Sequence, residues 1–505
     1  MTNVPFQNTP IENIEPLVRG LNAAFANQTT KPVEFRLKQL RKLYWALEDN
    51  AKDIEEALKL DLGKAKFDAQ TGEIGWVQND ILYITKNLAK WVKDESIPDM
   101  PLAMMPMGYR IKKEPLGTVL VIGAYNYPVQ LALGPLLGAI AAGCTAVLKP
   151  SEQCPHVAMV LTKVCSVLDS TCFAVVQGGV PESTKLLDQT WDKIFYTGGA
   201  QVGKIIAKKA AETLTPTTLE LGGKNPAIIT KNADIKLAAR RLLWAKHQNA
   251  GQICLSQNYH LVERSVLPQL IKEFGNVYKE FYPNGVAASP DFPRIATDRG
   301  WQRLKHLLDT TSGKIIYGGN MDEKTRFIEL TVVEVDDVKD PLVADEHFGP
   351  IMVLLAVDSV DEAIRIANEV DPTPLTAYAF GAKAETDKIL EHVRSGGATV
   401  NDTLFHAANP IPPFGGLKTS GQGTYRGKAS YEAFTHRRVV ATTPGWVESL
   451  IKMRYPPYTD AKLKQFQSTG QGKPNFDRNG NVNYSLWNVL FSRKLLSFVA
   501  LISGK

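Results

Sequence analysis

Two short stretches of the chain carry residue types that could do covalent chemistry. Glu220 stands directly before a pair of glycines, and Cys254 ends the run that begins at Gly251, 34 positions after Glu220. A cysteine thiolate can attack a carbonyl carbon, and a carboxylate can act as the base that activates a water molecule. Most Glu and Cys residues in a long chain are structural, so the pair by itself favours ordinary buried residues. The surrounding motifs decide between the two interpretations.

Four further stretches occur in the order and at roughly the intervals found in aldehyde dehydrogenases. They are Glu114–Pro128, Val147–Glu152, Phe195–Gly199 and Glu346–Pro350. With them, the chain resembles that superfamily from about residue 35 to about residue 440. Within the superfamily it resembles the class 3 and fatty aldehyde dehydrogenase branch, on residues 215–226, 413–416 and 436–438, and its fungal members, on residues 453–457 and 476–481.

The resemblance implies three catalytic residues. Cys254 would be the nucleophile, and Glu220 the general base for thioester hydrolysis. The Asn126 side-chain amide and the Cys254 backbone N–H would hold the oxyanion that forms on attack. The structural alternatives are a buried thiol, a charged residue at a strand end, and an Asn that forms a turn before Tyr127 and Pro128. The glycines at 222 and 223 favour the catalytic interpretation, because they let backbone approach a ligand closely.

The resemblance also implies a nicotinamide cofactor. Lys149 and Glu152 would lie at the adenosine ribose, where a carboxylate repels a 2′-phosphate, so we expect NAD, with NADP also possible. A solvated surface pair is the alternative for these two residues. The glycine-rich turn that starts at Thr197 opens a helix whose N-terminus suits a pyrophosphate, although Gly199 stands where Ser or Asn is common. The expected cofactor-binding residues are Lys149, Glu152, Thr197, Gly198, Gly199, Gly203, Leu221, Glu346 and Phe348.

Substrate and product follow from the same resemblance. We expect oxidation of long-chain aliphatic aldehydes to carboxylic acids, with the same chemistry on an apocarotenoid aldehyde as the alternative. Tyr125, Phe405 and His406 are candidates for the lining of a substrate tunnel. Acyl transfer to CoA is disfavoured because the hydrolytic base at Glu220 is present. A catalytically silent scaffold on the same fold is disfavoured because Cys254 is present as well.

The elements that must position these residues alternate between strand and helix. Short apolar runs at 119–122, 145–148, 173–176 and 193–196 predict buried strands, and the helix expected at 131–142 ends at Gly143. A second α/β series begins near residue 226. Strands that alternate with helices predict an α/β fold with a Rossmann-type parallel sheet. Ahead of the first sheet, the spacing of apolar residues predicts two helices over 35–60 and one over 72–93.

We therefore expect an aldehyde dehydrogenase-like organisation with four parts. Residues 1–96 and 115–221 would form the NAD-binding domain, and 222–404 the α/β catalytic domain. Residues 97–114 and 405–445 would form a small bridging sheet that pairs with a second subunit, which makes a homodimer the expected assembly. Residues 446–505 would form a C-terminal extension.

Composition narrows the class of protein. The chain has 505 residues, of which 44% are hydrophobic and 22% charged, as in soluble globular proteins of more than one domain. A net charge of +6 gives no reason to expect nucleic acid as a partner. Five cysteines without a Cys-x-x-Cys pair indicate free thiols and no metal site. The first residues lack the pattern of a secretory signal, so we expect a cytoplasmic protein.

The C-terminal segment 485–502 is strongly apolar but contains Asn488, Arg493 and Lys494. A bilayer-spanning helix needs roughly 20 predominantly apolar residues, which this segment does not offer without interruption. We expect an interfacial helix that attaches the protein peripherally to an intracellular membrane surface. A helix that packs over the catalytic domain or caps a tunnel mouth is the alternative.

Overall fold

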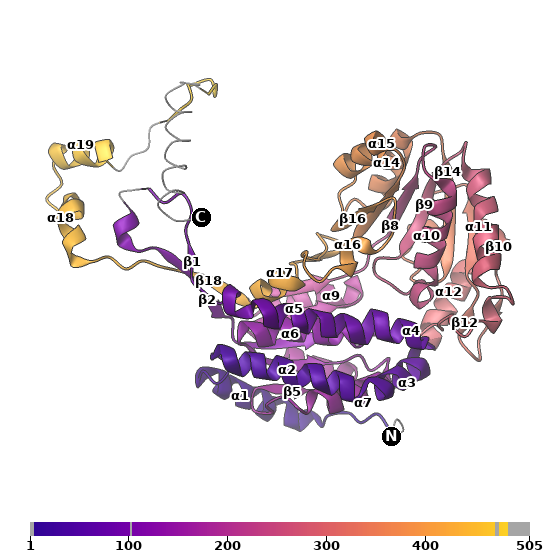
Figure 1. The fold of residues 1–505 in the computed structure, drawn as a ribbon, viewed down its shortest axis with the longest axis horizontal. Helices are drawn as coiled ribbons and strands as arrows, with labels where there is room; N and C mark the ends of the chain where they lie inside the picture. The colour runs from indigo at the N-terminus through magenta and orange to yellow at the C-terminus, as the bar shows by residue number, and fades with distance from the viewer. Residues whose placement is uncertain (1–4, 102–103, 470–473, 483–505) are drawn as a thin grey trace. The chain divides into compact units, whose positions relative to one another are not determined.

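The computed structural model describes residues 5–101, 104–469 and 474–482. The alternating strands and helices after residue 117 form two large, mainly parallel sheets (Figure 1). The chain divides into two compact units. The larger unit contains the residues up to Lys93 together with Lys113–His436, and the smaller contains Asp94–Lys112 and the chain from Arg437 onward. All the predicted catalytic and cofactor-binding residues belong to the larger unit.

The first sheet has six strands in the order β17-β7-β6-β3-β4-β5. Its strands are β3 (Thr118–Ile122), β4 (Thr145–Lys149), β5 (Phe173–Val175), β6 (Lys193–Thr197), β7 (Thr217–Glu220) and β17 (Gly421–Gln422). All pair in parallel except β17, which runs antiparallel to β7. The four strands predicted here are confirmed, and so is the α/β class. Both faces of the sheet are covered, which explains the continuous apolar runs of its strands.

Helices follow these strands and bury their apolar faces on the sheet. They are α6 (Gln130–Ala142), α7 (Pro155–Cys165), α8 (Val180–Leu187) and α9 (Ala200–Ala211). Nearly all of α6 is buried, and it ends at Gly143, whose φ of 90° lies in the left-handed region that favours glycine. Because the strands are parallel, their carboxyl ends meet at one edge of the sheet. Lys149, Thr197 and Glu220 are the last residues of β4, β6 and β7, so the fold gathers them there.

The helices before the sheet form from amphipathic segments. They are α1 (Ile11–Ala26), α2 (Val33–Asp49), α3 (Ala51–Leu62), α4 (Lys66–Ala69), the π-helix η1 (Gln70–Ile74) and α5 (Gly75–Trp91). The leucines of α2 that recur at helical spacing, Leu40, Leu43 and Leu47, are fully buried. The predicted helices within 35–60 and 72–93 are confirmed, whereas α1 and the π-helix were not predicted.

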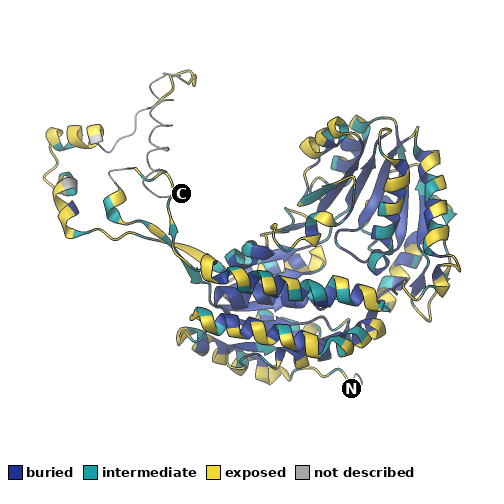
Figure 2. Cartoon of the chain, in the orientation of Figure 1, coloured by how far each residue is buried: buried dark blue, intermediate teal, exposed yellow. Residues whose placement is uncertain are grey.

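The second sheet has seven strands in the order β10-β13-β14-β9-β8-β15-β16. They are β8 (Asn225–Ile229), β9 (Gln257–Glu263), β10 (Lys314–Tyr317), β13 (Thr331–Val335), β14 (Ile351–Val357), β15 (Thr376–Phe380) and β16 (Gly397–Val400). Its main helices are α10 (Ile235–His247), α11 (Leu267–Phe281), α12 (Asp298–Thr310), α14 (Val360–Val370) and α15 (Lys383–His392). Figure 2 shows that the strands of both large sheets are buried and that exposed residues lie on the outer helices.

The third sheet is small and has the strand order β1-β2-β18. Its strands are β1 (Glu95–Ser96), β2 (Arg110–Pro115) and β18 (Thr435–Val440). The expected arm boundary at residue 405 differs from the structure, because 405–434 belongs to the larger unit. There α16 (Phe405–Ala408) contacts β16 of the second sheet, β17 pairs with β7 of the first sheet, and α17 (Gly427–Ala433) packs on α6.

The smaller unit also contains α18 (Glu448–Ile451) and α19 (Asp460–Thr469). The segment 485–502, for which we predicted an interfacial helix, lies outside the described residues. Within the described part of the chain, no helix combines the length and apolarity needed to cross a membrane.

Candidate active site

A sharp turn after α10 delivers Cys254. The helix ends at His247, and Asn249, Ala250 and Gly251 then adopt positive φ values of 49°, 50° and 70°. Positive φ at residues other than glycine is strained, and such strain is concentrated at functional sites. At Gly251 a Cβ would lie 2.1 Å from the carbonyl oxygen of Gly349, so only glycine fits.

Two polar side chains hold the main chain at Cys254. The Asn225 side-chain amide donates to the carbonyl oxygen of Cys254 at 2.7 Å and to that of Ser256 at 2.9 Å. The Tyr378 hydroxyl donates to the carbonyl oxygen of Leu255 at 2.6 Å. Neither residue was among the predicted site residues. Asn225 stands within the stretch that follows Glu220, but its partners lie about 30 residues away in the sequence.

The thiol of Cys254 and the carboxyl group of Glu220 both have raised pKa values. Burial, reinforced by the negative charges of Glu220 and Glu346, raises the pKa of Cys254 to about 12. Burial also raises the pKa of Glu220 well above its ordinary value. Glu220 is 3% exposed, and among the described residues no group meets the distance and angle of a hydrogen bond to either carboxylate oxygen, although the backbone N–H of Gly416 offsets part of the rise in pKa. A buried carboxyl group without partners can take up a proton near neutral pH.

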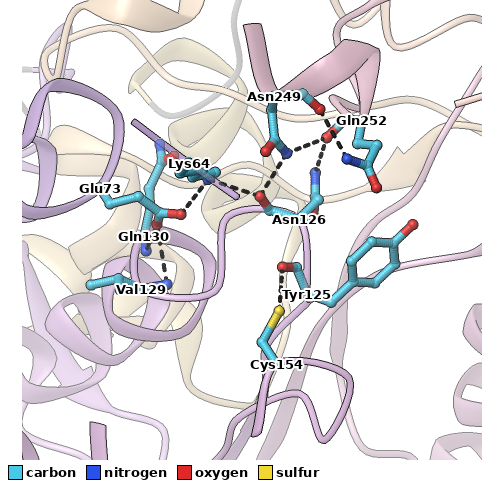
Figure 3. A network of polar contacts seen from close by, with 9 residues as sticks. All are labelled: Lys64, Glu73, Tyr125, Asn126, Val129, Gln130, Cys154, Asn249 and Gln252. Carbon is cyan, nitrogen blue, oxygen red and sulfur yellow. Dashed lines mark hydrogen bonds and ion pairs between the residues drawn. The ribbon is translucent and has the colours of Figure 1, made fainter. Parts of the chain in front are cut away.

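Asn126 lies in the turn between β3 and α6, and hydrogen bonds join it to the cysteine loop (Figure 3). Its side-chain amide donates to the carbonyl oxygen of Gln252 at 3.1 Å, two residues before Cys254. Its own carbonyl oxygen accepts from Lys64 Nζ at 3.0 Å and from Asn249 Nδ2 at 2.8 Å. An amide carries two N–H groups, so the second remains for another acceptor. The structure therefore brings Asn126, Glu220 and Cys254 into one site.

The adenosine side of the expected cofactor site lies at the ends of β4 and β6. Lys149 is 4% exposed and forms an ion pair with Glu152, so the alternative of a solvated surface pair is wrong for the lysine. The Thr197 hydroxyl is buried and has no partner within the described part of the chain. Gly199 is the N-cap residue of α9 and provides no side-chain cap, and a Cβ on it would meet nothing within 4 Å.

Two glycines allow close packing around the start of α9. A Cβ on Gly203 would come within 2.7 Å of Leu221, so glycine at 203 lets α9 pack against Leu221. Gly198 is similarly crowded, since its Cβ would lie 2.3 Å from the Tyr196 hydroxyl. At the helix start the exposed Gly199 leaves backbone N–H groups accessible, where a phosphate group is favoured.

The nicotinamide side is formed by the loop from Glu346 to Phe348. The Glu346 carboxylate accepts the N–H of Gly223 at 3.3 Å, and burial raises its pKa to about 7. A Cβ on Gly222 would lie 2.3 Å from this carboxylate. We expected Gly222 to leave room for a ligand, and in the structure the Glu346 side chain occupies that room. Arg303 donates to the carbonyl oxygen of Glu346 at 2.9 Å, and the Phe348 ring lies 6.2 Å from that of Tyr125.

These residues fit a dinucleotide. Among the described residues, nothing caps the start of α9 and nothing bonds the Thr197 hydroxyl, so both can donate to a pyrophosphate, and two carboxylates, Glu152 and Glu346, are acceptors for ribose hydroxyls. Each group lies at the carboxyl edge of the first sheet or in the loop that faces Gly222 and Gly223.

The substrate side of Cys254 is apolar. A cluster of buried residues contains Ile253, Leu255, Leu375 and Ala407, and Tyr127, Cys254, Leu404 and Phe414 pack against it. His406, a predicted tunnel residue, stacks on Phe414 with ring centroids 6.5 Å apart, and burial lowers its pKa to about 4. Phe405 is 61% exposed. The chain around the nucleophile therefore presents carbon surface and an uncharged imidazole.

The sequence profile of the aldehyde dehydrogenase family matches residues 5–440. A beta-apo-4'-carotenal oxygenase of Neurospora crassa is 50% identical over 491 residues, which cover 96% of this chain and 92% of that protein. The dimeric NADP-preferring aldehyde dehydrogenase of Mus musculus is 39% identical over 449 residues, 88% of this chain and 98% of its own length. A substrate-bound structure of Staphylococcus aureus AldH has a TM-score of 0.88 at 40% identity and covers 91% of this chain and 99% of that one.

Proposed function

Since the chain belongs to the aldehyde dehydrogenase family and is an NAD(P)-dependent aldehyde-oxidising enzyme, we propose that its substrate is a long apolar aldehyde, with an apocarotenal the preferred one. The observation that carries the proposal is the apolar cluster around Cys254, which suits a hydrocarbon or polyene chain. The name of the Neurospora relative supports the apocarotenal within this class. Long-chain aliphatic aldehydes, which the sequence favoured, share the chemistry and the apolar character.

In the proposed mechanism the first step forms a bond between Cys254 Sγ and the aldehyde carbon. The thiol proton passes to water in the site as the bond forms, and the Glu220 carboxylate is kept for the later hydrolysis. The carbonyl oxygen becomes an oxyanion that accepts hydrogen bonds from the Asn126 amide and the Cys254 backbone N–H. NAD(P), when bound, supplies the hydride acceptor that converts the thiohemiacetal carbon to a thioester.

Hydrolysis of the thioester completes the reaction. Glu220 takes a proton from water, the resulting hydroxide adds to the thioester carbon, and the carbon–sulfur bond breaks to release the acid and the thiolate. Burial raises the pKa of Glu220, so its carboxylate is a stronger base toward water than an exposed carboxylate. Since no described residue donates a full hydrogen bond to the carboxylate oxygens, they can receive the proton of a water molecule.

Cofactor choice follows from Glu152. We expect NAD to be preferred over NADP, because a 2′-phosphate would face the negative charge of the Glu152 carboxylate. The Lys149 partner offsets part of that charge, so NADP should bind more weakly without being excluded.

We also propose a homodimeric assembly and a peripheral contact with a membrane. A homodimer that pairs through the third sheet is supported by the name of the mouse relative and by the largely exposed strand β18. Peripheral membrane contact through residues 485–502, on a cytoplasmic protein, rests on the apolar sequence of that segment.

The test is a comparison of substrates on one preparation of the full chain. Acid formation from an apocarotenal, from hexadecanal and from propanal is measured by chromatography with NAD and with NADP. We expect kcat/KM to fall in that order, and Cys254→Ser to abolish turnover of all three. A higher kcat/KM for propanal would contradict the proposal of a long apolar aldehyde. A higher kcat/KM for hexadecanal than for the apocarotenal would make a long-chain aliphatic aldehyde the preferred substrate.

A further inference from the structure

A fully buried ion pair lies behind the turn that carries Asn126 (Figure 3). Lys64 Nζ is 2.6 Å from Glu73 Oε1, and the two side chains are 1% and 0% exposed. Desolvation of two charges can outweigh their attraction, so a buried pair is weak support for stability alone. Neither residue belongs to the catalytic set proposed above, and their other contacts indicate what the pair does.

Lys64 holds the main chain of the oxyanion donor. Its ammonium group donates to the carbonyl oxygen of Asn126 at 3.0 Å and lies 3.8 Å from the centre of the Tyr127 ring. The lysine is itself fixed by the end of α3, where Gly63 takes a φ of 65° and a Cβ would press against Arg294 at 3.0 Å. Because Asn249 donates to the same carbonyl oxygen, both lone pairs of that oxygen are used.

Glu73 holds the other end of the same turn. Its second oxygen, Oε2, accepts the N–H groups of Val129 at 3.1 Å and Gln130 at 2.9 Å, at the start of α6. A carboxylate is stabilising at a helix N-terminus, where N–H groups lack partners within the helix. Glu73 lies in the π-helix over Gln70–Ile74, an irregularity that is frequent at functional sites.

We propose that the Lys64–Glu73 pair is a positioning element for the oxyanion donor. The pair fixes the main chain before and after the Asn126 turn, and so holds the Asn126 amide beside the Gln252–Cys254 segment. The inference rests on the proposed oxyanion role of Asn126. Lys64 and Glu73 act through Asn126 and do not touch the substrate.

A double-mutant cycle with Asn126 tests the inference. The paired change Lys64→Met with Glu73→Gln removes both charges at similar volume and leaves no buried charge without its partner. We expect the rate of the first NADH turnover to fall about 10- to 100-fold, as for a misplaced catalytic group, while KM for NAD changes less than about 2-fold. In the Asn126→Ala background the same paired change should lower the rate less than about 3-fold further.

Each outcome of the cycle has a distinct meaning. An equal loss in both backgrounds contradicts the inference, because the pair would then act through something other than Asn126. An unchanged rate after the paired substitution contradicts it as well. If Asn126→Ala alone keeps the native rate, the oxyanion role in the proposed function fails, and the inference falls with it.

Two further variants separate positioning from folding. Glu182→Gln removes the charge of another buried carboxylate, whose Oε2 accepts the N–H of Gly179 at 2.8 Å at the start of α8 rather than at the Asn126 turn. It should lower the melting temperature and leave the first-turnover rate within about 3-fold. If the paired variant does not fold, Glu73→Asp withdraws the carboxylate by one methylene while keeping its charge. A first-turnover rate reduced about 3- to 10-fold at normal KM for NAD is then expected, and a native rate would overturn the inference.

Discussion

The chemistry of Cys254 depends on the carboxylates around it. Its thiol is held in the protonated form by burial and by the negative charges of Glu220 and Glu346. The thiolate is the reactive species, so in the site without substrate the protonated thiol is unreactive. The pKa of Glu346, raised to about 7, means that its negative charge appears only as the pH rises through neutrality. Its influence on the thiol should therefore depend on pH.

We predict that Glu346→Gln speeds alkylation of Cys254 by iodoacetamide above pH 7 and leaves the rate unchanged below pH 6. Above its pKa the native Glu346 is negative and raises the thiol pKa, so its removal should increase the rate about 3- to 10-fold at pH 9. Peptide mapping by mass spectrometry separates Cys254 from the other cysteines, which are buried. Asp358→Asn on an exposed ion pair is the control, and equal pH profiles for Glu346→Gln and the native chain would refute the coupling.

The residues that sequence could identify are those whose motif is local. Cys254, Glu220 and Asn126 stand in recognisable stretches, and the structure places them together. Lys64 and Glu73 stand in no such stretch, because their contacts to the Asn126 turn span 62 and 56 residues of sequence. From the sequence, a Lys and a Glu nine positions apart would be interpreted as ordinary surface residues. Only the folded chain shows that they are buried.

At the scale of elements, the sequence predicts strands better than it predicts what joins them. The apolar runs of the first sheet were found because strands covered on both faces are continuously apolar. The π-helix and the positive-φ turn at 249–251 were missed, since no periodicity marks them. The return of β17 to β7 was also missed, because a two-residue antiparallel strand in a glycine-rich stretch carries no alternating pattern.

We predict that Gly251→Ala disables the enzyme through the turn that delivers Cys254. A Cβ there would lie 2.1 Å from the Gly349 carbonyl oxygen at a φ of 70°, so the cysteine loop and the Glu346 loop must move apart. The free energy of unfolding should fall by more than about 2 kcal/mol, and the first-turnover rate by at least about 100-fold. Chemical denaturation and rapid-mixing absorbance measure the two effects.

Gly20→Ala is the matched control for that substitution. Gly20 lies on the exposed face of α1, and a Cβ there would meet nothing within 4 Å. It should keep native activity and gain about 0.5–1 kcal/mol, because alanine favours the helix interior. Native stability in Gly251→Ala would show that the turn tolerates a side chain and would remove the steric argument.

At the scale of the whole molecule, we propose that the C-terminal segment 485–502 determines where the reaction takes place. We predict that the chain ending at residue 482 loses binding to vesicles that contain anionic lipid and keeps kcat on propanal. The physical reason is that 485–502 combines apolar residues with Arg493 and Lys494, which suits an anionic interface. Flotation of both chains with such vesicles measures it. Equal binding of the two chains would assign membrane contact elsewhere, and loss of propanal turnover would favour a tunnel-capping role.

The most direct test of the covalent mechanism is the mass of the enzyme after one turnover in Glu220→Gln. Without the base for hydrolysis, the thioester should accumulate after about one equivalent of NADH per active site. Intact-protein mass spectrometry should then show the mass of the acyl group, and peptide mapping should place it on Cys254. Steady turnover of Glu220→Gln at the native rate, or an acyl group on another residue, would contradict the account.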